Sequence, residues 1–281
     1  MQSNNPVFRN AEGFNGKAPA NATASYPGMT DPSTWGTGTP GAPVDTRGTG
    51  RMTIDSVVQK TAISLVVVIA AAIATWIYIG DITTGEPLNQ QDNLAQLSTA
   101  LLVGSGGAFI LSLFISFRRT VSPALVMVFA VLEGVALGAI SKAFETQFGD
   151  GIVMQAVVGT FAAFAGTLAA YKFFNIQVSS RFRTFVVAAM FGMVALGLLE
   201  LVLGMFGNAI GFYGFGGLGL VFAIAGLALG VFMLILDFDF VERGVAAGLE
   251  ERESWRAAFG ITVSLVWIYT NLLRILAIIR N

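Results

Sequence analysis

Residues 232–244 read FMLILDFDFVERG, an apolar run into which Asp237 and Asp239 are set before the run has ended. The run closes an apolar span at 216–240, which is long enough to cross about 30 Å of hydrocarbon as a helix. Six more spans of this kind lie at 57–80, 95–117, 122–143, 152–174, 184–206 and 256–279. The sequence therefore predicts an all-α membrane protein, a bundle of seven transmembrane helices.

The composition excludes several classes of function. Hydrophobic residues make up 54% of the 281 residues and charged residues only 12%, a balance typical of a protein in the lipid bilayer. The formal net charge of −1 gives no basic surface for nucleic acid. The chain has no Cys and no His, which removes thiol nucleophiles, serine–histidine pairs and the usual zinc ligands. We therefore expect no enzyme and no cofactor.

The positions of the positive charges predict an orientation. Residues 1–54 are rich in Pro and Gly and are predicted to form a disordered cytoplasmic tail, followed by a transmembrane domain at 55–281. With the tail inside, thirteen of the sixteen Lys and Arg residues fall on the cytoplasmic side: Arg9, Lys17, Arg47, Arg51, Lys60, Arg118, Arg119, Lys172, Arg181, Arg183, Arg243, Arg252 and Arg256. We expect a cell (inner) membrane protein with its carboxyl terminus outside and short connections, except between the sixth and seventh spans.

Five charged residues lie within or at the ends of the spans: Glu133, Glu200, Asp237, Asp239 and Arg274. Such residues are costly in hydrocarbon unless they are paired or hydrated, and they often mark functional sites. Glu133 lies near the middle of its span, whereas Glu200 is close enough to a span end to reach water. Asp237 and Asp239 point about 200° apart around a helix. We predict that Asp237 faces the bundle and that Asp239 faces interfacial water.

The seventh span offers a partner for Asp237. Asn271 and Arg274 are three residues apart and share one face of that helix. A carboxylate on the sixth span and this polar face are predicted to meet at a helix–helix seam, where the acid binds, senses or passes a cation. Asp237 is then a weak calcium ligand, with Glu133 as a second source of carboxylate oxygen.

Three segments carry a resemblance to a known family. They are RRTVSPALVMVFAVLEGVALGAIS (118–141), LILDFDFVERGV (234–245) and SWRAAFGITVSLVWIYTNLLRIL (254–276). Together with the seven-span plan, they resemble the Bax inhibitor-1 family of transmembrane Bax inhibitor motif proteins, and bacterial members in particular. The resemblance implies a bundle in which the other six helices surround the last one, and a calcium leak that is sensitive to pH.

The resemblance also implies roles for individual residues. Asp237 matches the first of two aspartates that share protons in the family, and the second falls on Asn271, where this chain has an amide. An arginine that latches the aspartates corresponds to Arg118 or Arg119. Without the second acid the like-charge repulsion is lost, and burial of Asp237 and proximity of Arg274 would act on its protonation in opposite directions.

Three functions follow from these observations. The first is a passive, pH-modulated cation leak channel, with calcium as the permeant ion. The second is a secondary transporter, which the absence of a convincing internal repeat disfavours. The third is a non-conducting membrane regulator that binds other membrane proteins, such as a quality-control protease, through the charged segment 242–256.

Overall fold

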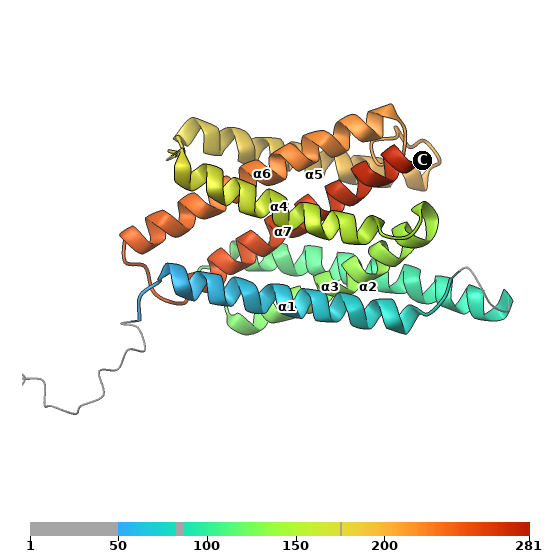
Figure 1. The fold of residues 1–281 in the computed structure, drawn as a ribbon, viewed down its shortest axis with the longest axis horizontal. Coiled ribbons are helices and arrows are strands. Elements are labelled where there is room, and N and C mark those ends of the chain that lie inside the picture. The colour runs from blue at the N-terminus through green and yellow to red at the C-terminus, as the bar shows by residue number, and fades with distance from the viewer. Residues whose placement is uncertain (1–49, 83–86, 175) are drawn as a thin grey trace, which may run out of the picture. The chain divides into compact units, whose positions relative to one another are not determined.

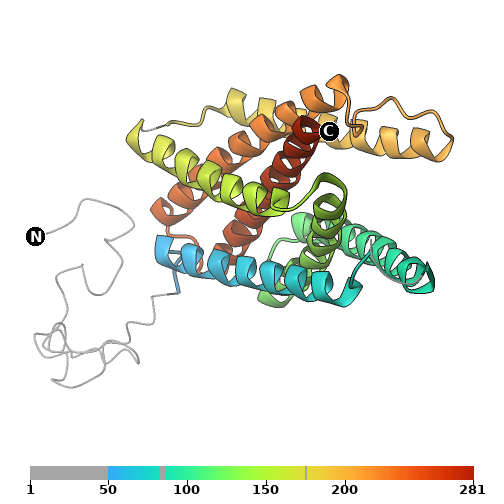
Figure 2. The same ribbon diagram turned by 45° about the vertical axis from the view of Figure 1, so that its right-hand side comes forward.

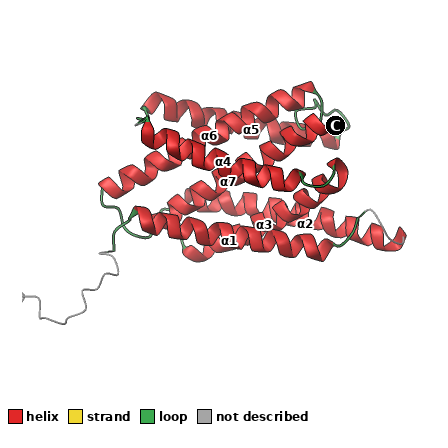
Figure 3. Cartoon of the chain, in the orientation of Figure 1, coloured by secondary structure: helices red, strands yellow, loops and turns green. Residues whose placement is uncertain are grey.

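The seven predicted spans are helices in the computed structural model, which describes residues 50–82, 87–174 and 176–281 (Figure 3). The helices are α1 Ile54–Ile79, α2 Pro87–Phe117, α3 Pro123–Phe148, α4 Ile152–Phe173, α5 Ser180–Met205, α6 Gly217–Ala246 and α7 Glu253–Arg280. Each is long and apolar enough to cross a membrane. The predicted all-α bundle is confirmed, while residues 1–49 of the predicted tail lie outside the described residues.

The connections differ from the prediction. α6 continues to Ala246 and α7 begins at Glu253, so only 247–252 separate them. The longer connection is 206–216, between α5 and α6. The expectation of one long link between the sixth and seventh helices was wrong because both helices extend beyond their apolar parts into polar sequence.

The last helix lies in the middle of the bundle. α7 packs against α1, α3, α4 and α6, and it runs between the α1–α3 and α4–α6 groups (Figure 1, Figure 2). Within the described residues, α2 contacts only α1 and α3, and α5 contacts only α6. The seventh helix is therefore central, although four helices and not six surround it.

Two glycines allow α3 to pack closely against α1. Gly134 and Gly138 of α3 face α1, and a Cβ at either position would collide with the carbonyl oxygen of Val68 or Ala72. Small residues at this spacing allow two backbones to approach each other in a membrane. The α1–α3 pair is thereby held as a unit beside α7.

The ends of the helices form two opposite ends of the bundle. The basic end comprises 50–53, 118–122, 174, 176–179 and 247–252, and the opposite end comprises 80–82, 149–151 and 206–216. At the basic end, the Met52 amide donates to the Leu249 carbonyl at 2.7 Å, and the Glu251 amide donates to the Gly50 carbonyl at 2.8 Å. These bonds tie the residues before α1 to the α6–α7 connection.

Candidate functional site

Asp237 lies at the seam between α6 and α7. Ser264 Oγ of α7 donates a hydrogen bond to Asp237 Oδ2 at 2.5 Å. One turn earlier on α7, a Cβ added to Gly260 would come within 2.8 Å of Asp237 Oδ1, so this glycine makes room for the carboxylate. Among the described residues no Lys or Arg lies within ion-pair distance of Asp237. The carboxylate therefore has a single neutral donor from α7.

Asn271 does not meet Asp237. It follows Ser264 by seven residues, which is about 10 Å along a helix. The side-chain amide of Asn271 donates to the Trp267 carbonyl of its own helix at 2.8 Å. The Asn271 side chain packs against Gly226 of α6, so closely that a Cβ at position 226 would collide with it. Because α6 and α7 are antiparallel, moving along α7 toward Asn271 moves away from Asp237 on α6. The predicted contact between these two residues was wrong, although the two helices do form a seam.

Arg274 points toward the α5–α6 connection. Its guanidinium donates to the Phe212 carbonyl at 2.7 Å and lies 4.6 Å from the centre of the Tyr213 ring. Burial raises the pKa of Tyr213, and the positive charge of Arg274 acts in the opposite direction. Arg274 therefore holds the 206–216 connection and does not neutralise Asp237.

Glu200 holds the same connection from α5. Its carboxylate accepts hydrogen bonds from the backbone amides of Ile210 at 2.9 Å and Gly211 at 2.7 Å. The residue is only 7% exposed, so the expectation that it reaches water at the span end was wrong. Glu200 is satisfied by backbone donors, which assigns it a structural role.

Asp239 is paired with two arginines. Arg183 of α5 donates to Oδ2 and Arg243 of α6 donates to Oδ1, both at 2.8 Å. Asp239 is 4% exposed, which contradicts the expectation that it faces interfacial water. It points toward α5 while Asp237 points toward α7, as the rotation of about 200° between them requires. The two aspartates thus have opposite surroundings. Asp239 is paired with two arginines, whereas Asp237 has no cationic partner in the part of the chain that the structure describes.

Glu133 also has no cationic partner among the described residues. It lies on α3 between Ala130 and Leu137, which are buried in a core cluster that includes Tyr269 and Leu273 of α7. Among the described residues, no hydrogen bond or ion pair of Glu133 is found. An ionised carboxylate at this depth requires water or a cation. The structure does not bring Glu133 into contact with Asp237.

A match to a family model over nearly the whole sequence identifies the family of this chain. The family model described as Bax inhibitor 1 like matches residues 5–281. The chain belongs to this family. A comparison with individual curated proteins returned no match. The family assignment agrees with the three motifs and the seven helices, and it supports a multi-pass membrane protein in a lipid bilayer.

In this Bax inhibitor 1 like protein, neither of the two latch candidates forms an ion pair with Asp237. Arg118 and Arg119 are in the connection after α2, where their backbone carbonyls accept hydrogen bonds from the Arg256 side chain. The guanidinium of Arg118 lies 5.1 Å from the ring centre of Phe114. Neither arginine is paired with Asp237 in the structure, so the latch that the resemblance implies is not formed.

Sequence reasoning missed the α7 partners of Asp237. Gly260 and Ser264 are four residues apart and share one helical face, which is the spacing of a small-residue contact. Their sequence GITVS lies inside the motif 254–276 and could have indicated a close approach of α6 and α7 at this level. The described residues contain no group of three or more acidic side chains that could hold a metal ion.

Proposed function

We propose that this Bax inhibitor 1 like protein is a passive cation leak channel for calcium, and that Asp237 is its ion-facing acid. The observation that carries the proposal is the contrast between the two aspartates of α6. Asp239 is neutralised by Arg183 and Arg243, whereas the Ser264 hydroxyl is the one partner of Asp237 found among the described residues. Carboxylate and hydroxyl oxygens are the ligands that calcium prefers.

The position of Asp237 along α6 fits a restricted pathway. It lies about 14 Å along the helix axis from Ala246, the last residue of α6 at the basic end. A cation that reaches it has to share the carboxylate with Ser264 or displace the hydroxyl. One oxygen ligand of this kind binds weakly, and a weak site allows an ion to leave again, as conduction requires.

Protons compete with cations for the same oxygens. Because the chain contains no His, carboxylates are the groups on which a pH response near neutrality depends. Protonation of Asp237 removes the negative charge that attracts the cation, so the leak falls as the pH falls. With Ser264 in place of a second acid at this contact, the response is that of one group and not of a coupled pair.

We infer the orientation in the membrane from the positive charges at the basic end. Arg118, Arg119, Arg243 and Arg252 lie at or near this end, and Lys and Arg accumulate on the cytoplasmic side of membrane proteins. We place the basic end in the cytoplasm and the carboxyl terminus, at Asn281, outside the inner membrane.

The test is calcium flux in liposomes that contain the purified full-length chain and an entrapped calcium indicator. The proposal expects a calcium leak well above that of protein-free liposomes. The rate of this leak should not depend on a second substrate or on a gradient of a counter-ion. A folded preparation without flux would refute the channel. That result would favour the non-conducting regulator, with segment 242–256 as its docking surface for another membrane protein.

A further inference from the structure

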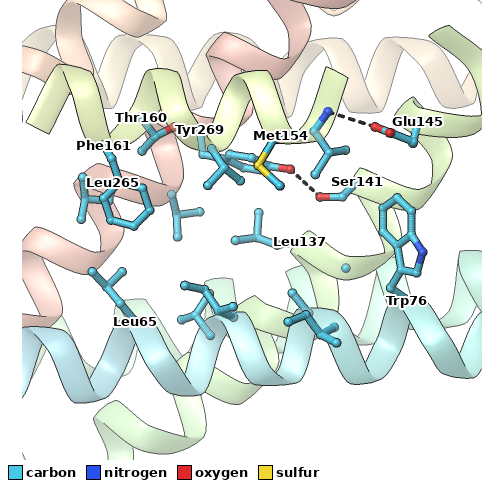
Figure 4. Close-up of a pocket in the computed structure, with 18 residues that line it drawn as sticks. Leu65, Trp76, Leu137, Ser141, Glu145, Met154, Thr160, Phe161, Leu265 and Tyr269 are labelled. Carbon is cyan, nitrogen blue, oxygen red and sulfur yellow. Dashed lines mark hydrogen bonds between the residues drawn. The ribbon is translucent and has the colours of Figure 1, made fainter. Parts of the chain in front are cut away.

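A separate cavity lies between α1 and α4. Its volume is about 470 Å³, and α3 and α7 form its inner wall (Figure 4). Most of its lining is aliphatic or aromatic, including Leu65 of α1, Leu137 of α3, Phe161 of α4 and Leu265 of α7. Asp237 is not part of this lining, so the cavity is distinct from the candidate ion site.

The cavity opens toward the lipid. α1 and α4 do not pack against each other in the part of the chain that the structure describes. Lining residues on both sides of the gap remain exposed: Ile73 of α1 by 55% and Met154 of α4 by 66%. Since both helices are membrane spans, these side chains face hydrocarbon. A molecule in the bilayer can therefore enter from the side.

One end of the cavity is polar. Ser141 Oγ and Tyr269 Oη are 2.6 Å apart, and Trp76 and Glu145 lie at the same end (Figure 4). The ammonium group of Lys142 lies 5.1 Å from the ring centre of Trp76. Tryptophan and lysine in this arrangement are typical of the boundary between hydrocarbon and lipid headgroups. The other end, near Leu65 and Leu265, is apolar.

The length of the cavity matches one leaflet. On α1 the lining extends from Leu65 to Trp76, which is about 16 Å along a helix. One leaflet contributes half of the hydrocarbon thickness, or about 15 Å. The polar end lies near Ile79, where α1 ends, and the apolar end lies near the middle of the span. The cavity thus follows a lipid chain from the headgroup level to the bilayer centre.

We propose that this cavity binds one acyl chain of a bilayer phospholipid, with the phosphate of the same lipid at Lys142. The aliphatic lining excludes water and ions, whereas a chain of methylene groups gains about 0.8 kcal/mol for each group that it buries. The positive charge of Lys142 complements the phosphate. Because Leu265 and Tyr269 belong to α7, the bound lipid contacts the central helix directly.

The experiment uses the full-length protein in liposomes that contain a phospholipid with a photoreactive diazirine at the end of one acyl chain. After irradiation, labelled residues are mapped by peptide mass spectrometry. We expect label on the inner wall, at Leu137 and Leu265. Label confined to outward-facing side chains such as Val158 in the unmodified protein would overturn the proposal.

Two variants test occupancy of the cavity. Val157→Trp places a large ring inside the lining, whereas the neighbouring residue Val158 is 60% exposed to the lipid, so Val158→Trp is the matched control. Loss of contacts to about two methylene groups lowers labelling of Leu265 about tenfold in Val157→Trp. Unchanged labelling in the folded variant would overturn the proposal. If Val157→Trp does not fold, Leu65→Trp with the control Val66→Trp gives the same comparison.

A third variant tests the headgroup. A photoreactive diacylglycerol has the same chains but no phosphate. In the natural protein we expect the phospholipid to label Leu265 about fivefold more strongly, as one Lys near the headgroups contributes about 1 kcal/mol. In Lys142→Gln the two lipids should label equally. Equal labelling in the natural protein would overturn the phosphate assignment.

Discussion

The contrast between the two aspartates of α6 predicts that the same substitution, Asp to Asn, affects stability differently at the two positions. Asp239→Asn removes the charge that Arg183 and Arg243 share, while Asp237→Asn keeps an oxygen that can accept the Ser264 hydrogen bond. The substitutions are nearly isosteric and two residues apart, so each is the control for the other.

The size of each change in stability can be estimated from the hydrogen bonds that the aspartate makes. Each hydrogen bond between Asp239 and an arginine involves charged groups and contributes about 1.5–3 kcal/mol in a buried setting. The side chains of Arg183 and Arg243 are 50% and 58% exposed. Water can therefore hydrate both guanidinium groups once the Asp239 charge is removed, which makes the loss of stability smaller than the sum of the two hydrogen bonds. We expect Asp239→Asn to lower the free energy of unfolding by about 1–2 kcal/mol. Asp237→Asn should change it by less than about 0.5 kcal/mol, or raise it, because an unpaired buried charge is removed.

The assay is reversible unfolding in mixed micelles at neutral pH, followed by circular dichroism. Arg183→Gln should lower the free energy of unfolding in the same way as Asp239→Asn. The double variant, with both substitutions, should be no less stable than either single variant. Arg181→Gln, two residues away on α5, should have no effect. An equal loss in Asp237→Asn and Asp239→Asn would refute the reasoning.

Three further predictions concern other parts of the chain. Gly134→Ala should lower stability by about 1–3 kcal/mol in the same assay, since its Cβ would meet the α1 backbone. Deletion of residues 1–48 should leave thermal stability in detergent unchanged, since their composition supports no core. Ser264→Asp should steepen the pH dependence of calcium flux by creating a carboxylate pair with Asp237, whereas Asn271→Asp should change it little.

Each of these predictions has a control or a contradicting result. Gly166→Ala should be tolerated, since no atom lies within 4 Å of a Cβ there. Deletion of residues 1–52 should destabilise the protein, as it removes the backbone bonds of Gly50 and Met52. A steeper pH profile in Asn271→Asp than in Ser264→Asp would show that the α6–α7 register differs from the one described.

The sequence predicted the helices well because hydrocarbon thickness sets the length of an apolar span. It predicted their ends less well. α2 was expected from residue 95 and begins at Pro87, because the polar stretch LNQQDN continues the helix beyond the apolar part. Hydropathy detects the apolar part of a helix that crosses the membrane. It does not detect the polar ends, where backbone hydrogen bonds continue the helix.

The candidate site was predicted only in part. Spacing along one helix assigns residues to faces, which placed Asp237 and Asp239 on different sides of α6. Spacing on separate helices does not give the axial register between them. That register depends on small residues such as Gly226 and Gly260, which let α7 approach α6 at two different levels. Asp237 therefore lies beside Ser264, and Asn271 lies beside Gly226.

The most direct test of the central claim is calcium flux in liposomes for the natural chain, Asp237→Asn and Asp239→Asn, each normalised to the amount of folded protein. Loss of the ion-facing charge should lower the flux about tenfold in Asp237→Asn, which corresponds to about 1.4 kcal/mol. Asp239→Asn should retain flux close to that of the natural chain. Equal flux in Asp237→Asn and the natural chain would contradict the assignment of Asp237 as the ion-facing acid.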